Sequence, residues 1–324
     1  MSAVQPKILV IRGGAIGDFI LTLPAIAALR RQFPTAHLEV LGYPHIAQLA
    51  VAGGLADRVQ PIEARGLAVF FARHGPLEPD LMDYFSEFEL VISYLYDPDG
   101  IFEANVRRCL VKQFIIGPHR PDETEPTHAT QVFLKPLERL AIFDADPVPR
   151  LAFNPQRTTP DLLALHPGSG SEKKNWPEEK WKELLRDLIN RTSVNLLLVG
   201  GEAEAGRLQH LAKVLPADRV QLAQNLSLCE LALRLRDCVG FIGHDSGITH
   251  LAAAVGLPTL VLWADTNEAI WRPLGQQVVV LRAEGGLAAL AIGPVMEQVA
   301  SLQGDKRFEQ DRSQLFRWRS PPAG

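Results

Sequence analysis

Asp18 closes a glycine-rich stretch, Arg12 to Asp18, that leads from an apolar run into a helical pattern. Small residues in such a turn let another molecule approach the backbone, and the start of a helix attracts negative charge. A carboxylate at this position supports two interpretations: it caps the helix, as Asp often does, or it takes a proton as a general base. The motif alone leaves both interpretations open.

The dinucleotide fingerprint G-x-G-x-x-G does not fit this stretch. It requires glycine at position 12, where Arg12 stands, and an acid after the second strand, whereas Glu39 falls inside that strand. An NAD-linked oxidoreductase is therefore kept only as an alternative.

A second motif, HPGSGSEKKNWP at residues 166–177, follows an apolar run and precedes a helical pattern. Serine hydroxyls, backbone N–H groups and lysine ammonium groups on one loop suit a phosphate or diphosphate. The order G-x-x-x-x-G-K-[ST] of a nucleoside-triphosphate loop is missing, which argues against that class. A polar turn with solvated lysines is the alternative. The candidate anion-binding residues of this loop are Ser169, Gly170, Ser171 and Lys174.

A third motif, GHDSGITH at residues 243–250, opens a helix. The free N–H donors at such a helix start, here those of Ser246 and Gly247, favour a second anion-binding loop. Asp245 precedes them, and His250 one turn later either holds a phosphate or makes a buried structural contact. Ser246, His250 and Asp245 could suggest a Ser-His-Asp hydrolase, but the G-x-S-x-G turn of that class is absent from this motif, which argues against it.

Two D-x-D pairs raise the question of a divalent metal, because carboxylate oxygens are ligands of Mg²⁺ and Mn²⁺. Asp97 and Asp99 follow an apolar run, so their placement suits a metal loop, whereas residues 144–146 read as a solvated turn. The other two anion loops carry no such pair, and we expect no metal site. Asp97 and Asp99 are kept as candidate binding residues, which the resemblance described below places on the acceptor side of a transferase.

Apolar runs that alternate with helical patterns position these motifs, and such alternation predicts parallel sheets covered by helices. In the first helix, from about residue 18 to 33, apolar residues form one stripe, and Pro24 should kink or loosen it. The segment 147–160 carries four prolines and marks a domain boundary. The expected strands cover residues 7–11, 37–41, 90–94, 114–116, 162–166, 195–199, 240–243, 259–263 and 277–281.

We therefore expect an N-terminal domain at 1–155, a C-terminal domain at 156–303 and a tail at 304–324, with a ligand cleft between the carboxyl ends of the two sheets. The 324 residues carry 33 basic and 37 acidic side chains, so no strong positive field favours nucleic acid. The start of the chain lacks the pattern of a secretion signal, which predicts a cytoplasmic protein. Basic and aromatic residues alternate in the tail, so peripheral contact with the inner membrane is an alternative to packing on the body. The three cysteines are expected to be reduced packing residues.

Four ordered segments, GDFILTLPAI, HPGSGSEKKNWP, DSGITHLAAA and WRPLG, together resemble glycosyltransferase family 9, the heptosyltransferases of lipopolysaccharide core synthesis. The resemblance covers nearly the whole chain. It implies a GT-B fold of two Rossmann-like domains that face each other across a cleft. It also implies a nucleotide-sugar donor, typically ADP-heptose, a lipid-linked saccharide acceptor, and inversion at the anomeric carbon without a metal or other cofactor.

The resemblance assigns Asp18 as the base and Lys174 as a group that stabilises the leaving diphosphate. A carboxylate that reaches the nucleoside is either Glu202 or Glu204. A nucleotide-sugar-binding scaffold without transfer activity remains an alternative. The other residues expected at the donor are Gly17, Ser169, Gly170, Ser171, Asp245, Ser246, Gly247 and His250.

Overall fold

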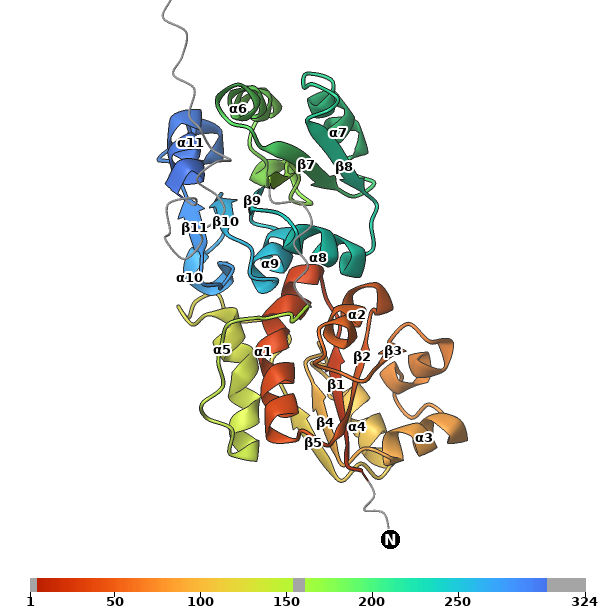
Figure 1. The fold of residues 1–324 in the computed structure, drawn as a ribbon. Coiled ribbons are helices and arrows are strands. Elements are labelled where there is room, and N and C mark those ends of the chain that lie inside the picture. Colours follow the sequence, from red (N-terminus) through yellow and green to blue (C-terminus); the bar gives the residue numbers. More distant parts are fainter. Residues whose placement is uncertain (1–4, 154–160, 302–324) are drawn as a thin grey trace, which may run out of the picture. The chain divides into compact units, whose positions relative to one another are not determined.

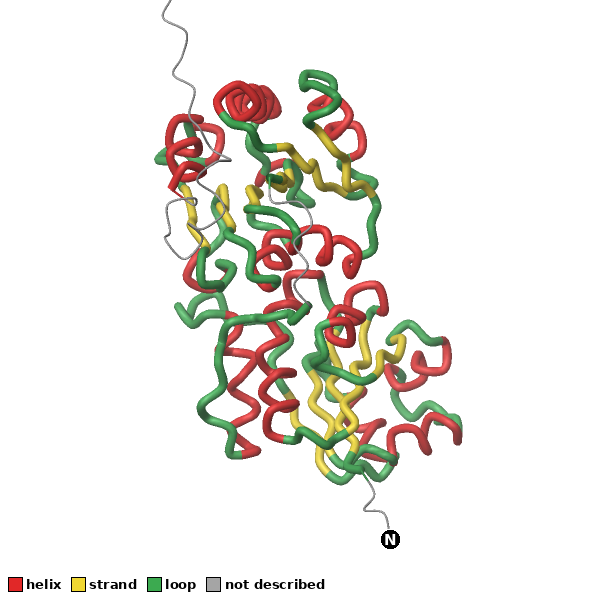
Figure 2. Tube along the Cα trace, in the orientation of Figure 1, coloured by secondary structure: helices red, strands yellow, loops and turns green. Residues whose placement is uncertain are grey.

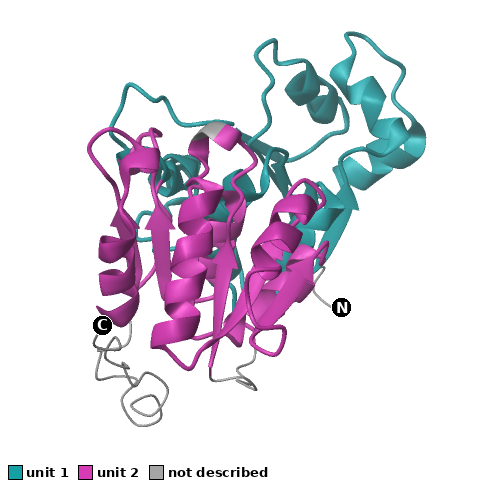
Figure 3. Cartoon of the chain, turned by 90° about the horizontal axis from the view of Figure 1, so that it is seen from above, with its two compact units in different colours: residues 1–152, 269–271 teal, residues 153–268, 272–324 magenta. Residues whose placement is uncertain are grey.

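The structure is a computed structural model that describes residues 5–153 and 161–301 (Figure 1). The expected boundary between residues 155 and 156 and the expected tail at 304–324 lie outside the described residues. The chain divides into two compact units, shown in different colours in Figure 3. Unit 1 contains residues 1–152 and 269–271, and unit 2 contains residues 153–268 and 272–324.

Unit 1 is built on a parallel five-stranded sheet with the order β3-β2-β1-β4-β5. Its central strand, β1, is buried from Ile8 to Arg12, as expected for a strand that has neighbours on both sides and helices on both faces. The strands are β1 (Lys7–Arg12), β2 (His37–Gly42), β3 (Arg58–Pro61), β4 (Leu90–Ser93) and β5 (Gln113–Ile116), and the α-helices are α1 (Ile16–Gln32), α2 (Pro44–Ala52), α3 (Pro79–Ser86), α4 (Ile101–Arg108) and α5 (Ala129–Leu134).

Helix α1 differs from the expected single apolar stripe. Every residue from Phe19 to Ile26 is buried, Thr22 and Pro24 included. Burial extends beyond the predicted stripe because α1 packs against both α5 and α2. The helix assignment also continues without a break through Pro24.

Unit 2 is built on a parallel six-stranded sheet with the order β11-β10-β9-β6-β7-β8. Figure 2 shows how strands in yellow alternate with helices in red along this part of the chain, as they do in unit 1. The strands are β6 (Leu162–His166), β7 (Asn195–Gly200), β8 (Val220–Gln224), β9 (Gly240–His244), β10 (Thr259–Leu262) and β11 (Val278–Leu281), and the α-helices are α6 (Glu178–Arg191), α7 (Ala205–Ala212), α8 (Leu228–Arg236), α9 (Gly247–Ala254) and α11 (Ile292–Ser301). The short helix α10 (Glu268–Trp271) contributes Glu268 to unit 2 and residues 269–271 to unit 1.

In both sheets the strand order reverses once, between β1 and β4 in unit 1 and between β6 and β9 in unit 2. Connections leave such a pair of strands toward opposite sides, which opens a crevice at their carboxyl ends where doubly wound sheets bind ligands. The stretch that ends in Asp18 follows β1, the loop that contains Lys174 follows β6, and Asp245 follows β9. The chemical motifs of the sequence therefore stand at the two switch points.

These two sheets confirm the prediction of two doubly wound α/β domains. The two strands that the sequence analysis missed, β3 and β8, lie at sheet edges, where polar side chains hide the strand pattern. The predicted cleft between the domains stays a prediction.

Candidate functional site

Asp18 is the third residue of α1 and contacts the start of that helix, whereas its role as a base stays a prediction. Its Oδ2 accepts a hydrogen bond from the backbone N–H of Ala15 at 3.1 Å, so the carboxylate does stabilise the helix start. Its side chain is 31% exposed, which leaves room for a substrate hydroxyl. Gly14 has φ +98° and approaches Oδ2 so closely that a Cβ there would lie 3.0 Å from it. Glycine at this position therefore makes room for the carboxylate.

Arg12 is buried behind Asp18 and is 3% exposed. Its Nη2 donates to the backbone oxygen of Asp18 at 3.2 Å and lies 3.8 Å from the carboxylate oxygen Oδ1. Its Nη1 donates to the backbone oxygens of Tyr94 and His119 at 3.2 and 2.8 Å. Burial lowers the pKa of this guanidinium, and the neighbouring Asp18 opposes that shift. One cation thus joins the loops that follow β1, β4 and β5.

The sequence analysis noted Arg12 only because it stands where the dinucleotide fingerprint G-x-G-x-x-G requires glycine. Its partners lie 6, 82 and 107 residues away along the chain, so no local pattern could reveal them. A charged residue that ends an apolar central strand is the signal that was available.

Asp97 caps α4, which accounts for its position after β4. Its two carboxylate oxygens accept hydrogen bonds from the backbone N–H groups of Phe102 and Glu103 at 3.1 and 2.9 Å. Asp99 is exposed and lies 3.8 Å from Arg73. The acceptor-side role expected for Asp97 and Asp99 stays a prediction, and the structure adds a helix-capping role for Asp97.

In unit 2, a buried histidine at the end of β9 holds both ends of the loop at residues 168–176. The Nε2 of His244 accepts a hydrogen bond from the backbone N–H of Trp176 at 2.9 Å, and its Nδ1 donates to the backbone oxygen of Gly168 at 3.2 Å. Burial lowers the pKa of His244 to about 3. The neutral ring with its proton on Nδ1 satisfies both contacts, so this imidazole is a structural clamp.

Lys174 and Asp245, predicted separately, form one ion pair. Nζ of Lys174 lies 2.7 Å from Oδ2 of Asp245, and the same oxygen accepts a hydrogen bond from Oγ1 of Thr266 at 2.6 Å. The Lys174 side chain is 34% exposed and that of Asp245 10%. The carboxylate therefore fixes an ammonium group that still faces solvent at the switch point between β6 and β9.

The start of α9 stands beside this pair. Ser246 is the N-cap, and its hydroxyl accepts from the N–H of Thr249 at 3.4 Å, which leaves the N–H groups at the first turn of the helix, beginning with Gly247, directed out of the helix end. The Ser246 hydroxyl also lies 3.4 Å from Nδ1 of His166, whose pKa burial lowers to about 4. His250 is buried within α9, so the structural contact and the phosphate contact both remain predictions for it.

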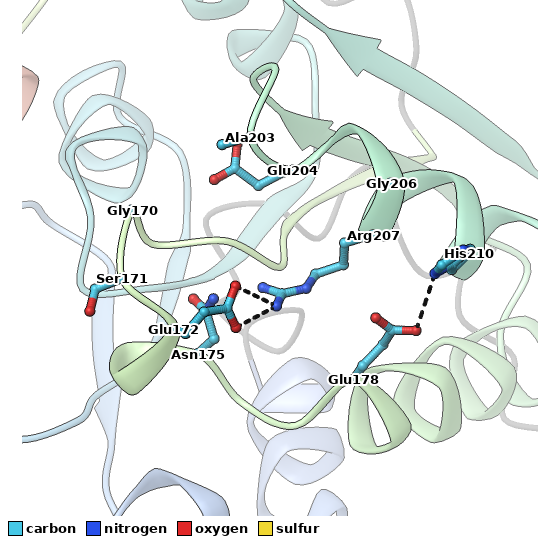
Figure 4. Close-up of a pocket in the computed structure, with 10 residues that line it drawn as sticks. All are labelled: Gly170, Ser171, Glu172, Asn175, Glu178, Ala203, Glu204, Gly206, Arg207 and His210. Atoms are coloured by element: carbon cyan, nitrogen blue, oxygen red, sulfur yellow. Dashed lines mark hydrogen bonds and ion pairs between the residues drawn. The ribbon is translucent and has the colours of Figure 1, made fainter.

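A pocket of about 410 Å³ opens between the loop at 170–175 and the start of α7 (Figure 4). The guanidinium of Arg207 lies at its centre, where Nη2 donates to both carboxylate oxygens of Glu172 at 2.9 and 2.7 Å and Nη1 donates to the backbone oxygen of Pro167 at 3.1 Å. Arg207 thus ties α7 to the same loop, and sequence analysis missed it. The lining residues are Gly170, Ser171, Glu172, Asn175, Glu178, Ala203, Glu204, Gly206, Arg207 and His210.

The structure separates the two candidate nucleoside carboxylates. Glu204 lines the pocket and accepts a hydrogen bond from the N–H of Gly201 at 2.9 Å, whereas Glu202 is exposed and is not among the lining residues. A Cβ at Gly168 would lie 2.4 Å from Cγ of Glu204, so this glycine lets the two loops approach. Geometry therefore favours Glu204 for contact with a bound ligand.

Ser169 mainly braces its own loop. Its hydroxyl lies 2.8 Å from the backbone oxygen of Ser171 and 2.7 Å from Oδ1 of Asn175. Gly170 has φ +73°, a conformation that glycine adopts without strain, and Ser171 is exposed. Gly17 is in the first turn of α1 in unit 1, beside Asp18, so its predicted contact with the donor stays a prediction.

Among residues 5–153 and 161–301 there is no cluster of three or more His, Cys, Asp and Glu side chains arranged for a metal ion. Within the same ranges, no helix combines the length and apolar character needed to span a bilayer. The three cysteines are unpaired thiols, two of them buried.

The chain is similar to known sugar transferases in sequence and fold. A family model described as glycosyltransferase family 9 (heptosyltransferase) matches residues 139–297. Lipopolysaccharide heptosyltransferase 1 of Pseudomonas aeruginosa is 26% identical, with 86% of this chain and 84% of that protein covered. Lipopolysaccharide heptosyltransferase 3 of Escherichia coli is 24% identical, with 81% of this chain and 84% of that protein covered.

Solved structures show the same fold. A family 9 glycosyl transferase from Veillonella parvula aligns with a TM-score of 0.74 at 17% identity, covering 93% of this chain and 98% of that one. The E. coli heptosyltransferase WaaC with ADP aligns with a TM-score of 0.73 at 20% identity, and the alignment covers 91% of this chain and 99% of that one. The fold is therefore of the GT-B type. The family match in the C-terminal half, the relatives and the fold together identify the protein as a glycosyltransferase that is similar to glycosyltransferase family 9, the heptosyltransferase family.

Proposed function

We propose that the protein transfers heptose from ADP-heptose to a saccharide of the lipopolysaccharide core, with inversion at the anomeric carbon and without a metal ion. The observation that carries the proposal is that each sheet presents the required group at its switch point: the exposed carboxylate of Asp18 after β1, and the ammonium group of Lys174 after β6. The names of the full-length relatives support the choice of lipopolysaccharide and heptose.

On the acceptor side, Asp18 takes the proton of the acceptor hydroxyl as that oxygen attacks the anomeric carbon of the donor. The bond between this carbon and the diphosphate oxygen breaks as the new glycosidic bond forms, and ADP leaves with the electron pair. Attack from the face opposite the leaving group inverts the anomeric centre. The hydrogen bond from Ala15 and the contact with Arg12 hold the carboxylate in one orientation for this step.

On the donor side, negative charge gathers on the diphosphate as the bond breaks, and fixed positive groups stabilise it. Lys174 supplies a full charge that Asp245 orients, and the first turn of α9 supplies N–H donors. Ser171 and Glu204 line the adjacent pocket, where we place the nucleoside, with Glu204 positioned for the ribose hydroxyls. A solved relative that carries ADP supports an adenine nucleotide as the ligand.

The decisive experiment measures release of ADP from ADP-heptose by the purified full chain, with and without lipopolysaccharide truncated before its heptose residues. We expect release that depends on the acceptor, persists in EDTA, and yields a product whose anomeric configuration, read by NMR, is opposite to that of the donor. Binding of ADP without release would favour the nucleotide-sugar-binding scaffold. A thermal-shift screen of ADP, UDP, GDP, CMP and NAD tests the nucleotide separately, because a ligand that binds only the folded state raises its stability.

A further inference from the structure

Two exposed aromatic rings stand together beside the switch point of unit 1, after β4 and its outer neighbour β5. Tyr96 follows β4 and is 68% exposed, although most side chains of its size are largely buried in folded proteins. Its ring centroid lies 4.6 Å from that of the exposed His119, which follows β5, with 59° between the planes. The two rings thus form a small aromatic surface contributed by neighbouring strands of the sheet.

This surface is connected to the proposed base by a single buried guanidinium. Arg12 binds the backbone oxygen of His119, the backbone oxygen of Tyr94 two residues before Tyr96, and the backbone oxygen of Asp18. The N–H of Tyr94 also continues the pairing of β4 with β1 by donating to the oxygen of Ile11 at 2.9 Å. The aromatic pair and Asp18 therefore belong to one rigid edge of the sheet, on either side of the point where its strand order reverses.

We propose that Tyr96 and His119 bind a sugar ring of the acceptor and so help to determine which saccharide is glycosylated. This inference rests on the proposed function. One face of a pyranose ring carries C–H groups that pack against the electron-rich face of an aromatic ring, while its hydroxyls stay free for polar partners such as the imidazole nitrogens. Because Arg12 contacts the backbone of Tyr94, His119 and Asp18, a sugar bound on Tyr96 would lie on the same edge of the sheet as the proposed base.

Phe143 provides a matched control in the same unit. It is 70% exposed, much like Tyr96. The residue next to it, Asp144, accepts a hydrogen bond on its backbone oxygen from Arg31 in the last turn of α1. Asp18 is in the first turn of α1, so Phe143 lies near the opposite end of that 17-residue helix. Loss of the Phe143 ring removes a comparable exposed aromatic side chain away from the base.

The test compares Tyr96→Ala, Tyr96→Phe, His119→Ala and Phe143→Ala in the full chain, with ADP-heptose as donor and truncated lipopolysaccharide as acceptor. We expect Tyr96→Ala to raise the acceptor KM about 2- to 12-fold, the scale of one lost aromatic contact, while the donor KM and the affinity for ADP stay unchanged. Tyr96→Phe should retain the wild-type acceptor KM, because stacking needs the ring and not its hydroxyl. His119→Ala should raise the same KM, and Phe143→Ala should leave it unchanged.

An acceptor KM for Tyr96→Ala equal to that of the wild type would overturn the inference, and so would an equal rise for Phe143→Ala. A rise in the donor KM of the same size would also overturn it, because it would show a general loss of structure. Absence of transfer by the wild-type protein would instead reject the proposed function, so the two failures are distinguishable. Circular dichroism and the melting temperature of each variant confirm that the fold is intact.

Discussion

Nζ of Lys174 lies 2.7 Å from Oδ2 of Asp245, although the two residues are 71 positions apart in the chain. Strands β6 and β9 pair directly at the switch point of unit 2, and this pairing brings the loops that follow them together. Asp245 also accepts a hydrogen bond from Thr266, so its carboxylate is held from two sides. The pair places a positive group of fixed position where the proposed diphosphate binds.

We expect Lys174→Ala to weaken the binding of ADP about 10-fold or more, which is the usual effect of losing a charged hydrogen bond. The variant also leaves Asp245 without its cation, and this uncompensated carboxylate repels the diphosphate. Isothermal titration with ADP measures the change. Lys112→Ala is the control, since it removes an exposed lysine that is paired with Glu89 in the other unit. Equal ADP affinity for the wild type and Lys174→Ala would remove this lysine from the donor site.

Asp18→Ala should lower the rate of transfer about 10²- to 10⁴-fold, the usual contribution of a positioned base. The affinity for ADP should stay unchanged, because Asp18 and the anion-binding loops of the donor belong to different units. Asp18→Asn is the matched variant: its amide oxygen can still accept from Ala15, so it retains the helix contact and loses only the basic oxygen. Turnover by the Asn variant at the wild-type rate would rule out Asp18 as the base.

Arg12→Met should lower the free energy of unfolding by roughly 3 kcal/mol or more. It removes the hydrogen bonds of a buried charged group to the backbone oxygens of Tyr94, His119 and Asp18, and such bonds are costly to lose. The Asp18 oxygen keeps its bond from the Thr22 hydroxyl, so most of the loss falls on Tyr94 and His119. Chemical denaturation measures the free energy of unfolding of Arg12→Met and of the control variant Arg73→Met. Arg73 is 69% exposed and makes one contact at 3.8 Å, so its loss should change stability by less than about 0.5 kcal/mol. A similar small effect at both positions would contradict the joining role of Arg12.

The two acids of the D-x-D pair should differ in their effect on stability. Asp97→Ala removes the acceptor of two N–H groups at the start of α4 and should cost about 1 kcal/mol, the typical value of a helix cap. Asp99→Ala should cost close to nothing, since its side chain is 64% exposed. Urea unfolding of both variants tests this, and equal losses would show that Asp97 is not a cap. The acceptor KM of each variant tests the acceptor-side role independently.

Stability should fall as the pH decreases from about 6.5 toward 4, because burial lowers the pKa of His166 from 6.5 to about 4. In this interval the unfolded chain binds a proton at His166 that the folded chain excludes, so protonation favours unfolding. Above pH 6.5 neither state is protonated and the effect is absent. Each such histidine contributes a slope of about 1.4 kcal/mol per pH unit, and His244 adds its own.

His166→Asn should reduce that slope, since the amide does not titrate and can keep the contact with Ser246. The comparison uses urea unfolding at pH 7, 6 and 5 and concerns the slope, because the substitution also shifts stability at every pH. A wild-type slope in the variant would show that His166 is protonated in the folded protein.

Much of the fold could be predicted because buried parallel strands are short apolar runs. The strand expected at residues 162–166 has those same bounds in the structure, and all five of its residues are buried. The capping box that Ser227 and Glu230 form at the start of α8 can be recognised in the sequence, because this signal depends only on two residues that lie three positions apart. The edge strand β8 was missed because the polar residues Gln221 and Gln224 interrupt its apolar run.

The candidate site could be predicted only one loop at a time. Glycines, serines and charged residues after a strand indicate an anion-binding turn, but not its partner across the sheet. The contacts of Arg12 and Arg207 depend on which strands lie side by side. The spacing of residues within a short segment does not predict the order of the strands in a sheet. The choice between Glu202 and Glu204 likewise needed the pocket itself, since both follow the same strand.

His244 fixes the loop between Gly168 and Trp176 at both of its ends, because one imidazole contacts the backbone of both residues. Between these ends, Glu172 is held by Arg207 of α7. We therefore expect loss of the His244 ring to disturb the loop at both ends at once, and with it the wall that this loop contributes to the pocket.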